Sequence, residues 1–373
     1  MFDYKNAEKI LEAEDVVVKF NLRGKTLTAI RGISMELYKG ESLAIVGESG
    51  SGKSVFTKTF MGLLDQNGWV DSGSIIYSGG KYTGKGVDLV PMKTEKEWLN
   101  IRGKEIAMVF QDPMTSLNPL KTIGKQIQET VELHQNLKGE EAKKKTIEIL
   151  EDVGIAEPER RYKQYPHEFS GGMRQRVVIA IAVACNPEIL ICDEPTTALD
   201  VTIQAQILKL LHNLQEKYQL TIIYITHDLG VVANVADRIA VMYAGDIVEV
   251  GLCEEIFYNA KHPYSWALLS SLPQLGVKGE PLYSIKGTPP NLFNEIKGDA
   301  FAPRNPQALK IDFEIRPPHF EVRFLRLRHR ADAQNANRAK ESHWDVERSN
   351  QMPRTASPRR NSSRNRTGAY KRR

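Results

Sequence analysis

The sequence predicts an α/β fold built around a parallel β-sheet, and two observations carry that prediction. Short apolar runs that fit buried strands alternate with helix-like segments along residues 42–226, which is the pattern of strand–helix–strand units. Polar or glycine-rich segments follow several of these runs directly. Because the carboxyl ends of parallel strands share one edge of a sheet, we expect the functional groups to gather at that edge.

The N-terminal region, residues 11–39, predicts antiparallel strands because apolar and polar positions alternate along it. Phe20 lies in this region, and two interpretations of it carry equal weight. Its ring offers a π face that binds an adenine base without hydrogen-bond geometry. It fits a plain core position on a strand equally well. We therefore keep Phe20 as a candidate nucleotide-binding residue.

A phosphate-binding loop is predicted at residues 47–54, between a strand-like apolar run and a helix-like segment. Its sequence follows the pattern G-x-x-x-x-G-K-[ST], in which glycines let backbone N–H groups turn toward a phosphate. Lys53 supplies a charge for the β and γ phosphates, and the Ser54 hydroxyl is a ligand for Mg²⁺. The chain is therefore expected to bind a nucleoside triphosphate through Gly47, Ser49, Gly50, Ser51, Gly52, Lys53 and Ser54.

The middle of the chain predicts helices between buried strands. Residues 118–161 have a helical pattern, with apolar positions among many lysines and glutamates, and Gly154 and Pro158 end it. An amphipathic helix is predicted over residues 201–218, and a short helix over residues 265–272. Strand-like runs lie at residues 106–110, 189–192 and 221–226.

A second anion site is predicted at Ser170, Gly171 and Gly172, where a hydroxyl and two glycine N–H groups open a helix. One chain has no use for two γ-phosphate cradles on a single nucleotide. In a head-to-tail dimer, however, the second cradle of each subunit closes the nucleotide of the other. This segment therefore predicts dimerisation.

Polar residues at the ends of three strand-like runs predict the hydrolytic machinery. Asp193 is expected to reach Mg²⁺ through water, and the adjacent Glu194 is expected to orient and polarise an attacking water. His227 would supply a donor to the γ-phosphate, where charge develops. Gln111 is a weak signal alone, but beside the other groups it is expected to sense Mg²⁺ and water.

Together with Ala198-Leu199-Asp200, these motifs resemble in order and spacing the full motif set of an ATP-binding-cassette (ABC) ATPase. The resemblance covers about residues 10–265. It implies a P-loop NTPase with a RecA-like core, an antiparallel β subdomain and an α-helical subdomain at about residues 113–177. The ABC nucleotide-binding domain would occupy residues 1–265, with ATP as its nucleotide and Asp200 as a further nucleotide-site residue.

Other segments resemble the ATPases of oligopeptide and dipeptide permeases, of the subunit type whose signature ends in Met. They include Asn118-Pro119-Leu120, the signature with Met173, His262-Pro263-Tyr264 and Gly287-Thr288-Pro289-Pro290. The resemblance implies a C-terminal extension over residues 266–320 and a motor subunit for peptide import at the cytoplasmic face of the plasma membrane. The implied partners are a second, non-identical ABC ATPase, two transmembrane permease subunits and, indirectly, an extracellular peptide-binding protein. The segment at about residues 112–135 would dock a membrane subunit.

The C-terminal region departs from that family in one respect. Many members carry cysteines there that hold an iron–sulfur cluster, whereas this chain has Asp299 and Asn305 at two of the matching positions. Because no thiolate ligands remain, no cluster is expected. The three cysteines of the chain are elsewhere and are expected to be reduced, buried thiols.

The charge distribution sets the end of the chain apart. The formal net charge is +5, but residues 321–373 alone hold 15 Lys and Arg against 5 Asp and Glu. Lysine dominates before this segment and arginine within it. We interpret residues 321–373 as a disordered tail, and as a reading-frame or cloning artefact in preference to a basic arm for anionic lipid or nucleic acid.

Other function classes fit less well. The longest apolar run, residues 177–185, is far shorter than the roughly 20 residues of a membrane-spanning helix, and the N-terminus has no apolar stretch typical of a secretory signal. A nucleic-acid-associated ABC ATPase is the alternative, but the segment between Ser54 and Ser170 shows no sustained heptads. No nucleic-acid partner is therefore expected. A non-hydrolysing subunit is disfavoured because Glu194 and His227 are both present.

Overall fold

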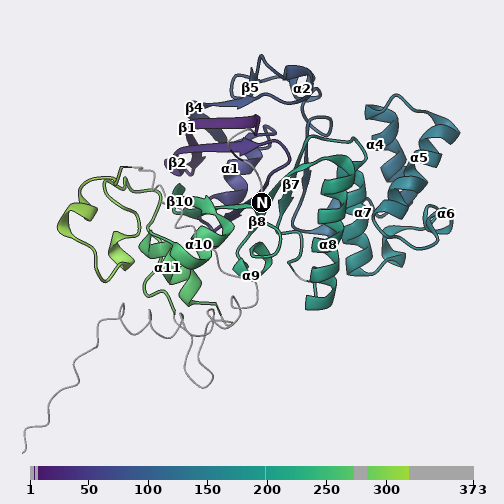
Figure 1. Cartoon of the computed structure of the whole chain (residues 1–373). Coiled ribbons are helices and arrows are strands. Elements are labelled where there is room, and N and C mark those ends of the chain that lie inside the picture. Colours follow the sequence, from purple (N-terminus) through teal and green to yellow (C-terminus); the bar gives the residue numbers. More distant parts are fainter. Residues whose placement is uncertain (1–3, 5–6, 198, 273–283, 319–373) are drawn as a thin grey trace, which may run out of the picture. The chain divides into compact units, whose positions relative to one another are not determined.

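The computed structural model describes residue 4 and residues 7–197, 199–272 and 284–318. Ala198 of the Ala198-Leu199-Asp200 motif and the basic tail over residues 321–373 lie outside the described residues. The chain divides into two units, residues 1–317 and 318–373. Every described helix and strand belongs to the first unit (Figure 1).

A six-stranded sheet forms the centre of this unit, with the strand order β10-β9-β3-β8-β7-β6. Its five strands from β9 to β6 pair in parallel, and β10 pairs with β9 in the antiparallel direction. Every residue of β3, β7 and β8 is buried, which explains their continuous apolar runs. The predicted α/β fold is thereby confirmed. The strands are β3 (Ser42–Val46), β6 (Ile106–Val109), β7 (Ile189–Asp193), β8 (Thr221–Thr226), β9 (Arg238–Tyr243) and β10 (Asp246–Leu252).

A second, antiparallel sheet has the order β2-β1-β4-β5, and its strands are β1 (Lys9–Leu22), β2 (Lys25–Tyr38), β4 (Gly68–Tyr77) and β5 (Val87–Asp88). A two-residue turn joins β1 to β2, with φ of 52° at Arg23 and 78° at Gly24. Positive φ at both turn residues matches the twist of the two strands. The antiparallel strands expected over residues 11–39 are therefore present.

The central sheet separates two hydrophobic cores. Because side chains alternate along a strand, Ala44 and Val46 of β3 enter one core, and Leu43 and Ile45 enter the other. The first core joins the sheet to the larger helices. The second joins it to the antiparallel sheet and to α1 (Lys53–Thr59), whose Phe56 is fully buried there. The start of α1 is thereby fixed between two sheets.

Of the helices that contribute to the first core, α4, α5, α7 and α8 lie on the side away from β1 and β2 (Figure 1). In α4, burial of Ile123, Ile127 and Val131 at intervals of four residues gives one apolar face against the core. No helix in the described part of the chain is long and apolar enough to span a bilayer. The remaining helices are α2 (Glu95–Trp98), α3 (Pro113–Ser116), α4 (Ile123–His134), α5 (Gly139–Asp152), α6 (Pro158–Arg161), α7 (Gly171–Val183), α8 (Val201–Tyr218), α9 (Leu229–Val232), α10 (Cys253–Asn259) and α11 (Pro263–Ser270).

Residues 284–317 form a C-terminal segment with short 3₁₀ turns at Ala302–Arg304 and Lys310–Phe313. The N–H of Thr28 on β2 donates a hydrogen bond to the carbonyl of Leu292 at 3.3 Å. Arg316 binds Asp246 of β10 with a distance of 2.7 Å between Nη2 and Oδ2. The segment is therefore held against strands of both sheets.

Candidate functional site

The predicted phosphate-binding loop connects β3 to α1, and steric constraints require glycine at two of its positions. Gly52 has a φ of 103°, and a Cβ there would lie 2.9 Å from Cδ1 of Ile30. A Cβ on Gly47 would lie 2.1 Å from the carbonyl oxygen of Met242. The neighbouring strands therefore leave no room for a side chain at either position, and the loop backbone follows a tight path.

Lys53 is the first residue of α1, and its side chain folds back over the loop. Its Nζ donates to the carbonyl oxygens of Gly47 at 2.8 Å and Glu48 at 2.9 Å. Burial lowers the pKa of Lys53, and the negative charges of Glu194 and Asp193 act in the opposite direction. The ammonium group thus lies within the curve of the loop, where phosphate oxygens would find a point charge.

Ser54 and Asp193 bring two side-chain oxygen atoms together across the site. The Ser54 hydroxyl donates to Oδ1 of Asp193 at 2.9 Å. Burial raises the pKa of the Asp193 carboxyl, while the bond from Ser54 acts to lower it. Hard oxygen donors of this kind fit Mg²⁺, which binds through one or two protein oxygens together with waters and phosphates.

Glu194 is the centre of the remaining predicted catalytic residues. Gln111, just after β6, donates through Nε2 to Oε2 of Glu194 at 2.8 Å. Nδ1 of His227, just after β8, lies 3.2 Å from Oε1. The structure therefore brings together three side chains from three strand ends, as expected from the sequence.

Two further features of Glu194 were not anticipated. The Thr197 hydroxyl donates to Oε2 of Glu194 at 2.9 Å, although no sequence signal singled out Thr197. Glu194 also has a φ of 47°, in the left-handed region that L residues rarely occupy. Strained backbone of this kind is concentrated at functional positions.

The predicted second anion site opens α7. The Ser170 side chain accepts a hydrogen bond from the N–H of Met173 at 3.4 Å and so caps the helix. A Cβ on Gly172 would lie 2.7 Å from Cγ2 of Ile203, whereas a Cβ on Gly171 would meet nothing nearer than Cδ2 of Leu199 at 3.9 Å. Within the described residues, no hydrogen bond links Ser170, Gly171 or Gly172 to the loop at residues 47–54.

The structure places Phe20 and Asp200 in local roles. Phe20 is 9% exposed, and a Cβ on Gly68 would lie 2.4 Å from its ring. This position favours the core interpretation, and adenine stacking stays a prediction. The Asp200 carboxylate accepts from the N–H of Ile203 at 3.0 Å and caps α8. Its role in a nucleotide site also stays a prediction.

Sequence reasoning missed the residues that hold Glu48, the second residue of the loop. The Arg304 guanidinium donates to both carboxylate oxygens of Glu48, at 2.6 and 3.0 Å. The N–H of Glu48 donates to the Tyr264 hydroxyl at 2.9 Å. Tyr264 belongs to a motif noted in the sequence, where His262 caps α11 and Pro263 is its first residue. The motif could therefore have pointed to Tyr264 as a functional residue, whereas no pattern in the sequence pointed to Arg304.

Asp299 and Asn305 bind the local backbone. Oδ1 of Asp299 accepts from the N–H of Phe301 at 2.9 Å, and Oδ1 of Asn305 accepts from the N–H of Gln307 at 3.0 Å. The expectation of three buried thiols holds for Cys185 and Cys192 but is wrong for Cys253, which is only partly buried. Burial raises the pKa of the Cys185 thiol to about 12. The expected absence of an iron–sulfur cluster stays a prediction.

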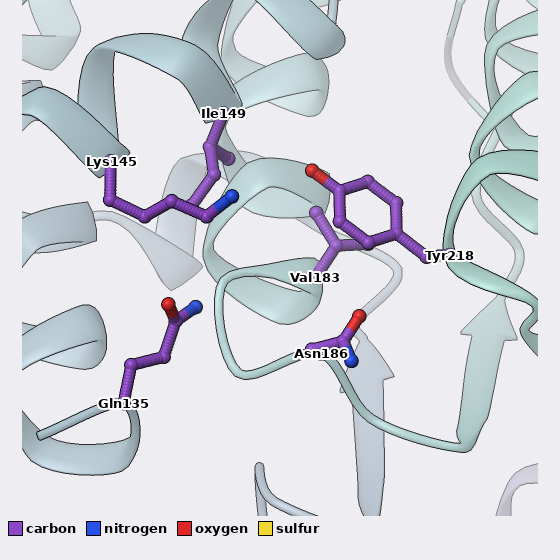
Figure 2. Close-up of a pocket in the computed structure, with 6 residues that line it drawn as sticks. All are labelled: Gln135, Lys145, Ile149, Val183, Asn186 and Tyr218. Carbon is purple, nitrogen blue, oxygen red and sulfur yellow. The ribbon is translucent and has the colours of Figure 1, made fainter.

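A cavity of about 280 Å³ lies away from these groups, between α5, α7 and the end of α8. Figure 2 shows the residues that line it: Gln135, Lys145, Ile149, Val183, Asn186 and Tyr218. None of them is a predicted site residue. Beside it, Asp152 at the end of α5 binds Lys217 and Tyr218 of α8. The cavity therefore belongs to the junction between the α4–α5 pair and the core.

Two protein families and several known proteins are similar to this chain. The family described as "ABC transporter" matches residues 30–197, and the family "Oligopeptide/dipeptide transporter, C-terminal region" matches residues 248–311. The oligopeptide transport ATP-binding protein AmiE of Streptococcus pneumoniae is 58% identical over 318 residues, which cover 85% of this chain and 88% of that protein. The oligopeptide transport ATP-binding protein OppD of Bacillus subtilis is 58% identical over 84% of this chain and 86% of its own length.

A solved structure is similar in fold. It is an ATP-binding cassette described as a dimer in a post-hydrolysis state with bound ADP and Pi. Its TM-score is 0.56 at 28% identity, over 65% of this chain and 98% of that chain.

Proposed function

The chain belongs to the ABC transporter family, and from that premise we propose that it is the ATP-hydrolysing subunit of an importer of oligopeptides or dipeptides. The observation that carries the proposal is the placement of Glu194. Its carboxylate is held by Gln111 and His227, next to the Ser54–Asp193 pair. Hydrolysis of a bound phosphate needs a group that orients the attacking water close to the groups that hold the phosphate and its metal ion.

Each part of the site has a distinct task in ATP binding. The N–H groups of the loop and the Lys53 ammonium bind the β and γ phosphates. Ser54, Asp193 and Gln111 would hold Mg²⁺, which neutralises charge on the phosphates when it is bound. A compact loop with little room for side chains lets the backbone approach the phosphates closely.

Hydrolysis depends on Glu194 and His227. The Glu194 carboxylate orients a water for in-line attack on the γ-phosphate and accepts its proton. His227 donates a hydrogen bond to the γ-phosphate as negative charge develops there. The contacts of Glu194 with Gln111 and Thr197 keep the carboxylate at a fixed position before the substrate arrives.

We propose further that the active form is a head-to-tail pair with a second, non-identical ABC ATPase. Ser170, Gly171 and Gly172 would close the nucleotide of the partner, with Asp200 nearby. The open space at Gly171, where a Cβ would meet no atom closer than 3.9 Å, supports this proposal. Gly171 is also exposed and is the first residue of α7, where N–H groups have no partner within the helix.

The transport assembly would add two transmembrane permease subunits and an extracellular peptide-binding protein. The segment at residues 112–135 fits a docking surface because it exposes large apolar side chains, with Met114 61% and Leu120 85% exposed. Docking there would place the subunit at the cytoplasmic face of the plasma membrane. The names of the relatives support the transport of oligopeptides for this chain, and import is the direction that we propose.

The test is the ATPase rate of the full chain, alone and with its partner ATPase. Activity is expected with the partner, and Glu194→Gln should lower it by at least about 100-fold, because it removes the proton acceptor. Glu216→Gln, on the exposed face of α8, is the matched control and should leave the rate unchanged. Full activity of the isolated chain that survives Glu194→Gln would contradict both the pairing and the catalytic assignment.

A further inference from the structure

Glu48 lies in the phosphate-binding loop and is held from three directions. Its carboxylate accepts two hydrogen bonds from Arg304, its N–H donates to the Tyr264 hydroxyl, and its carbonyl accepts from Lys53. Arg304 is 256 positions away in sequence and belongs to the C-terminal segment. A surface segment thus reaches the loop that binds the phosphates.

Groups other than Glu48 also hold the Arg304 side chain in place. Its side chain is only 4% exposed, its Nε donates to the carbonyl of Lys286 at 3.0 Å, and its Nη1 donates to the Tyr243 hydroxyl at 3.2 Å. The Tyr243 and Tyr264 rings lie 4.5 Å apart, and Phe301 lies against both. The aromatic rings and backbone carbonyls therefore hold the guanidinium fork in one orientation.

We propose that Arg304 and Tyr264 are positioning residues for ATP binding, and that the C-terminal segment uses them to hold the phosphate-binding loop in its receptive conformation. Through Glu48, they fix the backbone at the start of the loop, so that its N–H groups face inward before ATP arrives. Without them, ATP binding would have to order the loop, and affinity would fall by that entropic cost. The inference rests on the proposed function only in that the loop binds ATP.

The geometry accounts for the choice of arginine. A planar guanidinium binds both oxygens of a carboxylate and resists rotation, whereas an ammonium group acts as a point charge and leaves Glu48 free to turn. The segment also has an anchor that does not touch the loop: Arg316 binds Asp246 and the carbonyl of Gly32. Arg316 therefore provides a matched control for general attachment of the segment.

The test measures the Kd of the full chain for MgATP by titration calorimetry. Arg304→Ala and Glu48→Gln should each raise the Kd by about tenfold, the effect of losing a charge-assisted bond pair. The double variant should bind no more weakly than either single variant, because both changes remove the same contact. Arg304→Lys should give an intermediate Kd, and Arg316→Ala the wild-type value.

A second readout separates positioning from loss of structure. In the assembled ATPase pair, Arg304→Ala should raise the KM for ATP while kcat at saturating ATP stays within about twofold, since the residue does not touch the reacting atoms. If Arg304→Ala fails to fold, Glu48→Gln and Arg304→Lys carry the test, because each preserves side-chain volume.

Several outcomes would overturn the inference: a wild-type Kd for Arg304→Ala or for Glu48→Gln, effects that add in the double variant, or an equal loss of affinity in Arg316→Ala. A wild-type chain that does not bind MgATP would instead refute the proposed function, so the two failures are distinguishable.

Discussion

Two segments of this molecule are proposed to bind phosphate, and they differ in the contacts that each makes within the chain. In the loop at residues 47–54, Lys53, Glu48 and Ser54 are all bonded to groups of the same chain. At the start of α7, the Ser170 hydroxyl caps its own helix, and the space around Gly171 is open. The first segment therefore makes its contacts within one subunit, whereas the second has the open space that the proposed pairing with another ATPase requires.

The largest expected effect comes from removing the central group of each segment. Lys53→Ala should weaken MgATP binding to the isolated chain by about 100-fold, because the phosphates lose a buried cation. Ser170→Ala should leave that binding unchanged but lower the ATPase rate measured with the partner ATPase. Binding is checked by calorimetry and hydrolysis by phosphate release.

Equal loss of ATP binding in both of these variants would remove the distinction between the two segments. Lys209→Ala on α8, away from both segments, serves as the control for a change of charge.

Alanine at one glycine of each segment should shift stability in opposite directions. Gly52→Ala should lower the free energy of unfolding by about 2 kcal/mol, because it combines a φ of 103° with contacts near 3 Å. Gly171→Ala should raise it by a few tenths of a kcal/mol, since alanine favours a helix start that has room for it. Urea denaturation of the two variants measures both changes.

A Gly52→Ala protein as stable as wild type would show that the strands around the loop yield more readily than their packing indicates. For Gly171→Ala, which keeps the N–H group and adds a methyl group, a normal ATPase rate in the assembled pair would contradict a close approach of the partner's nucleotide to this position.

A smaller effect than that of Gly52→Ala is expected at Asp193. Burial raises its pKa above the ordinary 3.8, so its contribution to stability is present below that value and is lost as the pH rises through the pKa of the folded protein. At pH 7 the buried charge therefore destabilises the nucleotide-free protein. Asp193→Asn keeps an acceptor for Ser54 and should raise the Tm by a few degrees, on the order seen for single buried substitutions.

The gain in Tm should shrink as the pH is lowered toward 4, because the wild-type carboxyl then takes up its proton. Thermal melts across that range provide the check, with Asp65→Asn, an exposed position, as the control. A gain that does not change with pH would mean that the ionisation of Asp193 is not its cause.

The sequence predicted most elements of the fold and the residues at the strand ends, for a physical reason. A buried parallel strand and an amphipathic helix leave local patterns, and the helix Val201–Tyr218 and the strand Thr221–Thr226 have the predicted bounds. The gathering of Gln111, Glu194 and His227 then followed from the shared edge of the sheet.

Contacts between distant segments leave no such pattern. The Arg304–Glu48 pair spans 256 positions, and neither residue stands out locally. Thr197 was missed because its bond to Glu194 depends on the tight turn after β7. Phe20 shows a limit of local patterns as well. The alternation of apolar and polar residues placed Phe20 on a strand, but it did not indicate how far neighbouring residues cover the ring.

The left-handed backbone of Glu194 has a consequence for laboratory evolution. At a φ of 47°, glycine and asparagine are the residues with the least strain. A population of variants selected for heat resistance alone would therefore drift toward Gly or Asn at position 194, and its members would lose the ability to turn over ATP. We therefore expect Glu194 to be kept only where catalysis is selected together with stability.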